Sequence, residues 1–191
     1  YLVSILKFII LDWEDIVRIS LRLAKKISAS NFRPFCIIGL TRGGLIPARI
    51  LSDRLGINRL YTLGVSFYTD LAVHKKKPVI TQDIDADLLG KEVLVVDDVA
   101  DTGMSLILSK ETLLRRGASE VRLATLHKKP WSKVIPDYYV EETDAWIVYP
   151  WEYRETLDLL KKRLTTDLET KEKKTIEEAI NRIMELEEKY V

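Results

Sequence analysis

The stretch Glu92–Ser105 constrains the fold and the function of this 191-residue chain more than any other segment. Its residues Val93–Val96 form an unbroken run of branched apolar side chains, a pattern typical of a strand buried on both faces of a parallel sheet. Two adjacent acids, Asp97 and Asp98, are expected to end this strand. A short polar loop, Asp101–Ser105, follows and leads into a helix-like stretch, which Gly117 is expected to end. The sequence therefore predicts a strand, an acid pair, a loop and a helix, in that order.

The loop and the acid pair have complementary chemistry. A loop that opens a helix presents unpaired N–H groups and the positive end of the helix dipole, which suit a phosphate. Gly103 permits a close approach of the backbone, and Thr102 and Ser105 add hydroxyl donors. Asp97 and Asp98 can accept hydrogen bonds from a vicinal diol, or meet a bound Mg²⁺ through water. Together they indicate a ribose 5-phosphate ligand. An ordinary βα turn with a capping Asp is the alternative, but burying adjacent acids without a ligand is costly.

A second glycine-containing loop follows another apolar strand. Phe35–Leu40 runs directly into Thr41-Arg42-Gly43-Gly44, and a helix is expected from about Leu45 to Leu55, closed by Gly56. In an open α/β sheet, the carboxyl ends of the strands form the ligand-binding edge. The glycines let backbone N–H groups face an anion, and Arg42 offers a planar, charged fork for phosphate oxygens. A glycine-rich turn with a solvated arginine remains the alternative.

The order of the apolar runs predicts the fold class. Helical patterns alternate with extended runs at Phe35–Leu40, Leu60–Ser66, Val93–Val96 and Glu120–Leu126. This alternation favours an α/β fold with a mostly parallel central sheet flanked by helices. Beyond Trp151 the chain changes to helical spacing, with a capping box expected at Thr175 and Glu178. We therefore predict a C-terminal helical extension over residues 152–191.

Composition argues against several classes of protein and favours a cytoplasmic one. The net charge of +1 argues against a partner such as nucleic acid or a membrane surface. No apolar run approaches the length of a membrane span, and no signal peptide is evident. The single cysteine, Cys36, excludes a disulfide framework and is expected to be a buried thiol. Charged residues make up 31% of the chain and amides are few, which indicates a thermophilic source.

The segment VVDDVADTGMS resembles the PRPP-binding motif of the type I phosphoribosyltransferases. Thr41-Arg42-Gly43-Gly44 is similar to the pyrophosphate-binding loop of the purine-specific members. The resemblance covers about Leu11 to Trp151, and Met104 departs from it where many members have a second glycine. It implies the type I phosphoribosyltransferase fold, with residues 1–151 as the phosphoribosyltransferase domain. A small hood would come from about residues 67–90 and 130–151.

Two further segments resemble the base-binding parts of 6-oxopurine phosphoribosyltransferases. In Ala124–Pro130, Lys129 corresponds to the lysine that contacts the purine O6. In Asp144–Trp151, which resembles the W-I-x-x-P-W stretch of bacterial xanthine-guanine enzymes and their archaeal relatives, Trp146 would stack on the base. Ile147 would read the base through its backbone. A core role for Trp146 stays open, because tryptophan is mostly buried in any protein.

The resemblance implies a Mg²⁺-dependent purine-salvage enzyme that joins guanine, hypoxanthine or xanthine to PRPP, giving the nucleoside 5′-monophosphate and pyrophosphate. It would act in the cytoplasm on small molecules alone, as a homodimer or higher homo-oligomer. The basic segment Phe67–Pro78 is expected to be irregular. Its role as a flexible cover, with Lys75–Lys77, fits by position only. The residues implied are Asp97 and Asp98 for ribose and metal; Asp101, Thr102, Gly103, Met104 and Ser105 for the 5′-phosphate; Thr41, Arg42 and Gly43 for pyrophosphate; and Asp101, Asp97, Asp98 and Arg42 for catalysis.

Two alternatives stay open beside this function. The same fold could serve a regulatory protein that senses PRPP or a nucleotide without turning it over. Within the enzymes, the base could be adenine or orotate. Lys129 with Trp146 and Ile147 favours an oxopurine.

Overall fold

The computed structural model describes residues 7–70 and 75–190, which fall into two compact units. The larger unit spans residues 17–143, and the smaller one combines the chain up to residue 16 with the chain from residue 144. Helix α1 (Trp13–Ser28) begins in the smaller unit and continues in the larger one. In the part of the chain that is described, no helix has both the length and the apolar character that crossing a bilayer requires.

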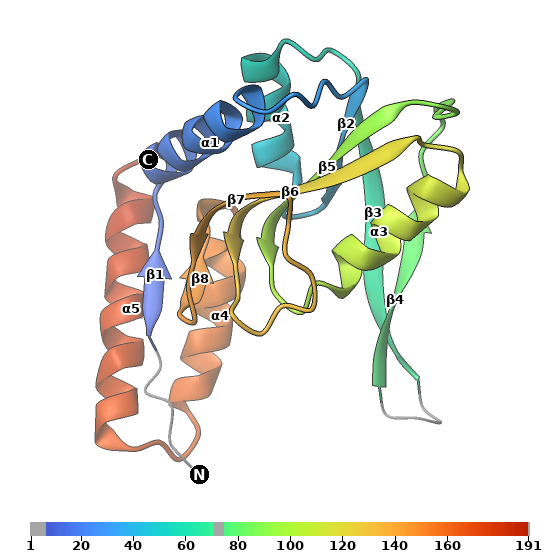
Figure 1. The fold of residues 1–191 in the computed structure, drawn as a ribbon. Coiled ribbons are helices and arrows are strands. Elements are labelled where there is room, and N and C mark those ends of the chain that lie inside the picture. Colours follow the sequence, from blue (N-terminus) through green and yellow to red (C-terminus); the bar gives the residue numbers. More distant parts are fainter. Residues whose placement is uncertain (1–6, 71–74, 191) are drawn as a thin grey trace. The chain divides into compact units, whose positions relative to one another are not determined.

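The larger unit is built on a six-stranded sheet with strand order β4-β3-β2-β5-β6-β7 (Figure 1). All neighbouring strands run parallel except β3 and β4. This confirms the predicted mostly parallel α/β sheet. The strands are β2 (Cys36–Thr41), β3 (Leu60–Asp70), β4 (Lys75–Gln82), β5 (Glu92–Ala100), β6 (Glu120–Lys128) and β7 (Tyr138–Glu142).

Helices α2 (Leu45–Leu55) and α3 (Met104–Arg115) pack on the sheet, and alternate residues of β2 face one helix or the other. Gly39 faces α2, because a Cβ atom at this glycine would lie 3.0 Å from that of Ala48. Its neighbours Ile38 and Leu40 share a buried core with α3. Since successive side chains of a strand point to opposite faces, the two helices cover the two faces of the sheet. The sheet core is therefore closed on both sides, as the unbroken apolar strands predicted.

Both helices end as the sequence predicted. Gly56 follows α2 with φ of +67° and Gly117 follows α3 with φ of +92°. Only glycine adopts this left-handed conformation at little cost, so each marks the end of its helix.

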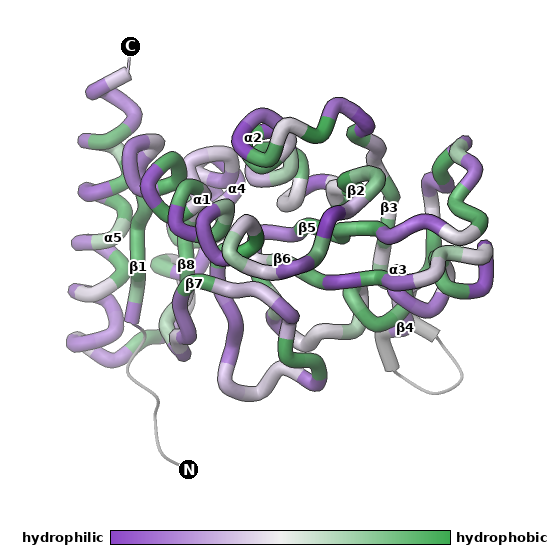
Figure 2. Tube along the Cα trace, turned by 45° about the horizontal axis from the view of Figure 1, so that its top comes forward, coloured by the Kyte–Doolittle hydropathy of each residue, from purple (hydrophilic) through white to green (hydrophobic). Residues whose placement is uncertain are grey.

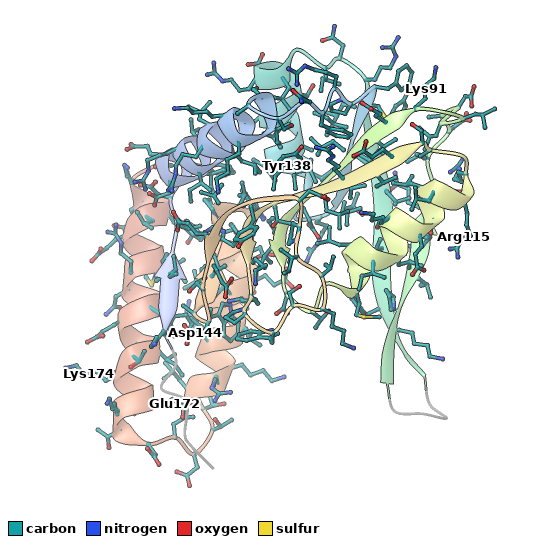
Figure 3. The ribbon with its side chains drawn as sticks, in the orientation of Figure 1. Lys91, Arg115, Tyr138, Asp144, Glu172 and Lys174 are labelled. Carbon is teal, nitrogen blue, oxygen red and sulfur yellow. The ribbon has the colours of Figure 1, made fainter. Side chains whose placement is uncertain are left out.

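Near the end of α1, the Tyr138 hydroxyl accepts a hydrogen bond from Arg122 (2.6 Å) and lies 2.8 Å from the hydroxyl of Ser30 (Figure 3).

Two local predictions in the larger unit are wrong. Strand β5 does not end at the acid pair but continues to Ala100, because β6 keeps pairing with it after the β2 ladder stops at Val96. The segment Phe67–Pro78 is not irregular where it is described. Strands β3 and β4 pair through it as a long antiparallel hairpin that extends beyond α3 in Figure 1. Residues 71–74, and the side chains of Lys75 and Lys76, lie outside the described residues, so the predicted cover stays untested.

The smaller unit has its own sheet and its own core. Strands β1 (Phe8–Ile10) and β8 (Trp146–Val148) pair in parallel, followed by a 3₁₀ turn (Pro150–Glu152), α4 (Tyr153–Leu164) and α5 (Thr170–Glu188). The two helices bury apolar side chains against Val148, among them Leu157, Leu160, Ile176, Ile180 and Ile183. Figure 2 shows the alternation of apolar and polar residues along α5.

The start of α5 was predicted wrongly, and β1 was not predicted at all. The helix begins at Thr170, and the hydroxyl of Thr175 donates to the carbonyl of Lys171, so Thr175 lies inside the helix rather than at its cap. The units also do not coincide with the predicted boundary at residue 151, because α4 and α5 share one core with β8. That boundary, like the predicted hood, stays a prediction.

The first turn of α1 is fixed by reciprocal capping. The Asp15 N–H donates to Oδ1 of Asp12 (2.8 Å), and the Asp12 N–H donates to Oδ2 of Asp15 (3.1 Å). Lys189, beyond the end of α5, reaches Asp12 (3.3 Å) and Glu14 (3.1 Å). The backbone hydrogen bond from Asp15 is the main cause that lowers the pKa of Asp12. This network joins the two chain segments of the smaller unit.

A buried histidine makes the stability depend on pH. Burial of His127 in β6 lowers its pKa to about 4 from 6.5; Lys129 acts in the same direction, and Glu141 opposes it. Below about pH 6.5 the unfolded chain therefore binds a proton that the folded chain excludes. We expect the free energy of unfolding to fall as the pH drops from 6.5 to 4, by at most about 3 kcal/mol.

Urea titrations across this pH range would measure the effect of His127. In His127→Gln the fall should be shallower than in the wild type, whatever the stability of the variant at neutral pH. Parallel curves for the two proteins would show that the histidine does not carry the acid sensitivity.

Candidate active site

Two loops lie at the same edge of the larger sheet, where strands β2 and β5 end. The two strands are parallel neighbours, so their carboxyl ends lie together. The loop Thr41–Gly44 follows β2, and the loop Asp101–Ser105 follows β5. The structure brings the first loop against the acid pair, because a Cβ atom added to Gly43 would overlap the carboxylate of Asp98. The two predicted site segments are thus in contact.

Close packing explains both glycines of the first loop. A Cβ atom at Gly44 would overlap the carbonyl oxygen of Val96 in β5, just as one at Gly43 would overlap Asp98. The Gly44 N–H also donates to the carbonyl of Leu40 (2.8 Å), and the peptide bond between Thr41 and Arg42 is cis. The tight turn holds Arg42 exposed at the sheet edge, where the sequence predicted a pyrophosphate contact.

We expect Gly44→Ala to destabilise the fold by about 3 kcal/mol or more. The added Cβ atom would overlap backbone atoms, which cannot move away as a flexible side chain can. Gly56→Ala is the matched control. A Cβ atom there meets nothing within 4 Å, so only the left-handed backbone strain of about 1 kcal/mol is added. Urea unfolding of the two variants measures the difference. Equal losses would show that the contact with β5 is not tight.

The two acids of the pair face different surroundings. Asp97 is half-buried, and its Oδ1 accepts the N–H of Asp98 (3.0 Å). Asp98 is only 7% exposed, lies against Gly43, and accepts the N–H of Val99 (2.7 Å). Each carboxylate is therefore oriented by the next backbone N–H. Only Asp97 lines the cavity described next.

A cavity of about 690 Å³ lies over the loop that follows β5. A volume of this size suits a small-molecule ligand such as a sugar phosphate. The cavity brings Asp97 together with the whole predicted phosphate loop. It also includes residues that the sequence analysis did not select as site residues, among them Phe67 of the hairpin and Lys133. The full lining is Phe67, Asp97, Val99, Asp101, Thr102, Gly103, Met104, Ser105, Leu106 and Lys133.

The chain after β6 is docked on the phosphate loop by backbone hydrogen bonds. The Lys129 N–H donates to the Ala100 carbonyl (3.0 Å), and the Lys133 N–H donates to the Thr102 carbonyl (3.1 Å). Gly103 has φ of +79° and immediately precedes α3, and a Cβ atom there would lie 2.7 Å from Cγ1 of Val134. Glycine is therefore required both by the turn and by the close approach. This docking explains how Lys133 reaches the cavity.

The two lysines at the end of β6 differ in their contacts. Lys128 forms an ion pair with Glu142, with Nζ 2.8 Å from Oε2. Lys129 is 8% exposed, and its Nζ lies 5.5 Å from the centre of the Trp131 ring. A cation over an aromatic face is favourable, and more so when it is desolvated. The Lys128 ammonium is thus held by a carboxylate, and the Lys129 ammonium lies near the face of an aromatic ring.

Trp146 and Ile147 lie in the smaller unit, on β8. Trp146 is half-buried, and its ring centre lies 5.8 Å from that of Phe8 on the paired strand. Ile147 is buried. Trp146 thus packs at the edge of the α4–α5 core, which is the alternative that the sequence left open. The predicted contact of both residues with a purine stays a prediction.

The acid pair fits a metal that arrives with its substrate. No group of three or more His, Cys, Asp or Glu side chains is arranged to hold a metal within the described residues. Mg²⁺ keeps several waters and is commonly held by one or two carboxylates together with substrate phosphates. Asp97 and Asp98 match that donor set.

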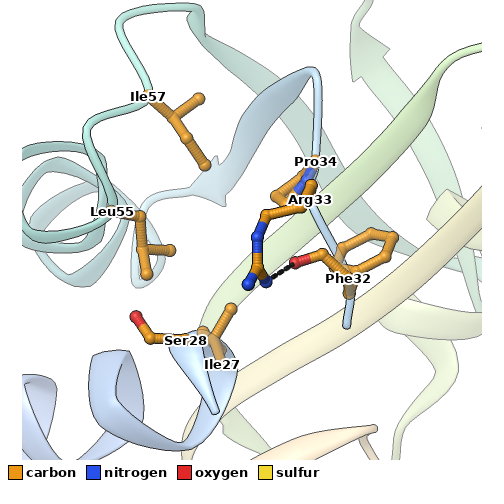
Figure 4. A pocket seen from close by; sticks show the side chains of 7 residues that line it. All are labelled: Ile27, Ser28, Phe32, Arg33, Pro34, Leu55 and Ile57. Carbon is orange, nitrogen blue, oxygen red and sulfur yellow. Dashed lines mark hydrogen bonds between the residues drawn. The ribbon is translucent and has the colours of Figure 1, made fainter. Parts of the chain in front are cut away.

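A second pocket of about 240 Å³ lies where α1 gives way to β2 (Figure 4). The Arg33 guanidinium donates to the carbonyls of Ser30 (2.7 Å) and Phe32 (2.9 Å), so it stabilises the turn between α1 and β2. The other lining side chains are largely apolar: Ile27, Phe32, Pro34, Leu55 and Ile57, with Ser28. This pocket lies beside the start of β2, at the end of the strand opposite the two loops, and holds none of the predicted site residues.

Comparison with known proteins identifies the class. The family model for the phosphoribosyl transferase domain matches residues 9–156, and the chain belongs to this family. This confirms the resemblance read from the two loops. A xanthine-guanine phosphoribosyltransferase of Cereibacter sphaeroides is 33% identical over 148 residues, which cover 74% of this chain and 84% of the relative.

Solved structures point to the purine branch of the family. A purine phosphoribosyltransferase from Pyrococcus horikoshii is 44% identical, with a TM-score of 0.68, over 75% of this chain and 93% of that one. A Neisseria gonorrhoeae protein with bound ppGpp is 30% identical, with a TM-score of 0.70, over 78% of this chain and 91% of that one.

Proposed function

We propose that this protein is a 6-oxopurine phosphoribosyltransferase of purine salvage. It would convert PRPP and guanine, hypoxanthine or xanthine to the nucleoside 5′-monophosphate and pyrophosphate. The observation that carries the proposal is a single sheet edge with complementary chemistry. There Asp97 and the loop Asp101–Ser105 line one cavity, Gly43 contacts Asp98, and Lys129 directly follows the neighbouring strand β6. The xanthine-guanine and purine enzymes among the relatives support it.

Each residue would act on one part of the substrates. The N–H groups at the start of α3 and the hydroxyls of Thr102 and Ser105 would bind the 5′-phosphate of PRPP. The carboxylates of Asp97 and Asp98 would accept hydrogen bonds from the ribose hydroxyls. Holding both reactants in line reduces the entropy that the reaction must lose.

The reaction forms a bond between a purine nitrogen and C1′ while the C1′–O bond to pyrophosphate breaks. The electron pair of that bond leaves with the pyrophosphate, and Arg42 would stabilise the added negative charge. Mg²⁺, when bound through Asp97, Asp98 and PRPP, would supply further neutralisation of this charge. The purine loses a proton as the new bond forms, and the carboxylate of Asp101 would hold or accept it at the N7 edge.

Product formation from PRPP, Mg²⁺ and each base separately tests the proposal. Nucleotide and pyrophosphate should form in equal amounts with at least one oxopurine, and little should form with adenine or orotate. Turnover of adenine or orotate instead would assign the protein to another branch of the family. Arg42→Ala should slow turnover much more than it changes the melting temperature, because Arg42 is exposed.

PRPP with Mg²⁺ should raise the thermal stability, because a ligand that binds only the folded state must stabilise it. At one hundred times its dissociation constant the gain is about 2.7 kcal/mol. The double variant Asp97→Asn/Asp98→Asn should lose most of this gain while keeping a normal far-UV spectrum. A thermal shift equal to that of the wild type would show that the acid pair does not bind the ribose or its metal.

A second candidate function is nucleotide sensing on the same fold. The Neisseria gonorrhoeae protein that binds ppGpp favours it, because a guanosine nucleotide occupies that relative. Binding of PRPP or nucleotide with no turnover of any base would identify a sensor. Turnover with an oxopurine identifies the enzyme, whatever regulatory nucleotide it also binds.

A further inference from the structure

Trp131 is a tryptophan at the candidate site to which the proposed function gives no role. Its side chain is 55% exposed, which is unusual for the largest apolar residue. Its Nε1–H donates to Oδ1 of Asp101 (2.9 Å), and the face of its ring lies 5.5 Å from Nζ of Lys129. One side chain thus contacts both of the larger unit's residues that would handle the purine.

The backbone on either side of Trp131 is fixed. Lys129 and Lys133 donate their N–H groups to the carbonyls of Ala100 and Thr102, so the segment is docked on the phosphate loop before and after the tryptophan. Within the segment, the Ser132 N–H donates to the Lys129 carbonyl (3.1 Å), and the Ser132 hydroxyl donates to the Val134 carbonyl (2.9 Å). The indole therefore projects from a turn whose backbone is held by hydrogen bonds on both sides.

The hydrogen bond has a defined effect on Asp101. Rotation about the last bond of an exposed aspartate is broad, so its carboxylate samples many orientations. A donor on Oδ1 selects one of them, and hydrogen bonds to a charged acceptor are stronger than neutral ones. A carboxylate accepts on both oxygens, so Oδ2 can still receive a proton or a hydrogen bond from a ligand. Orientation before the reaction lowers the entropy lost in the transition state.

We infer that Trp131 is a positioning residue of the transferase site. Its N–H aims the carboxylate of Asp101 at the purine, and its ring face holds the ammonium of Lys129 over the same ligand. The inference rests on the proposed function, since it assigns Trp131 a role through the two residues that this function gives to the base.

The test is a double-variant cycle with Trp131→Phe and Asp101→Asn. Phenylalanine keeps an aromatic face for Lys129 but removes the donor. We expect Trp131→Phe to lower kcat about tenfold, the usual effect of losing one hydrogen bond to a charged group, with the KM for PRPP unchanged. In the Asp101→Asn background the same change should lower kcat less than twofold, because residues that act through one another are not additive.

Two further variants separate the role of the ring from that of the N–H donor and provide a control. Trp131→Leu removes the ring as well as the donor, so it should also reduce the preference for guanine over adenine, which Trp131→Phe retains. Ile135→Ala is the matched control, because Ile135 lies on the same segment, is 72% exposed and has no assigned role. It should leave kcat and base preference unchanged.

The outcomes separate this inference from the proposed function. A wild-type protein with no oxopurine turnover would overturn both. An active wild type that Asp101→Asn impairs, combined with a normal kcat for Trp131→Phe or an equal loss in both backgrounds, would overturn the role of Trp131 alone.

Discussion

Replacing Asp101 by asparagine is expected to lower kcat for nucleotide formation by about two to four orders of magnitude, the usual contribution of a general acid–base group. The asparagine amide has the same size, and its oxygen can still accept the N–H of Trp131, so the loop geometry should be kept. What the amide cannot do is hold a proton from the purine. The loss should therefore appear in kcat, while PRPP binding measured without base is retained.

Steady-state kinetics with guanine and PRPP would measure the loss, and Asp85→Asn is the control. Asp85 is also an exposed aspartate in a loop of the larger unit, and it lies outside the cavity lining. Its replacement removes one negative charge without touching a proposed role. An Asp101→Asn variant with a kcat close to that of the wild type would assign the proton to another group or to water.

The parts of the site that the sequence predicted are those set by short-range patterns. The apolar run Val93–Val96 marks a buried strand, and Gly103 and Gly117 mark the two ends of the helix that follows. Each of these signals depends on neighbours within a few residues. The meeting of the two loops followed from one topological rule, that parallel strands share a carboxyl edge.

The parts that were missed depend on contacts between distant segments. The three residues of β1 carry no period long enough to identify a strand, and their pairing with β8 joins two segments that lie far apart in the sequence. Continuation of β5 past the acid pair depends on β6, a later strand. Trp131 meets Asp101 across 30 positions, and a loop tryptophan has no periodicity that would identify its partner. Resemblance to a family pointed to the segment around Trp131 but not to this hydrogen bond.

The second large effect concerns the choice of base. An oxopurine presents an acceptor at C6, where adenine presents a donor amino group, and a lysine ammonium has donors only. Lys129 is buried directly after β6, so water would not relieve a mismatch there. A buried unmatched polar group costs about 1–3 kcal/mol, enough for at least tenfold discrimination. We expect Lys129→Met to depress guanine and hypoxanthine turnover about tenfold or more and to remove most of the preference over adenine.

Lys128→Met is the matched control, because it removes a neighbouring buried lysine whose ammonium is paired with Glu142. That change should cost stability but leave the ratio of guanine to adenine turnover as in the wild type. Competition assays with both bases give this ratio directly, and a thermal shift with PRPP alone checks that the phosphate loop is intact in each variant. If Lys129→Met keeps the wild-type ratio, or if both methionine variants change it equally, the ammonium of Lys129 does not read C6. Base choice would then depend on other groups, with Trp146 and Ile147 the next to test.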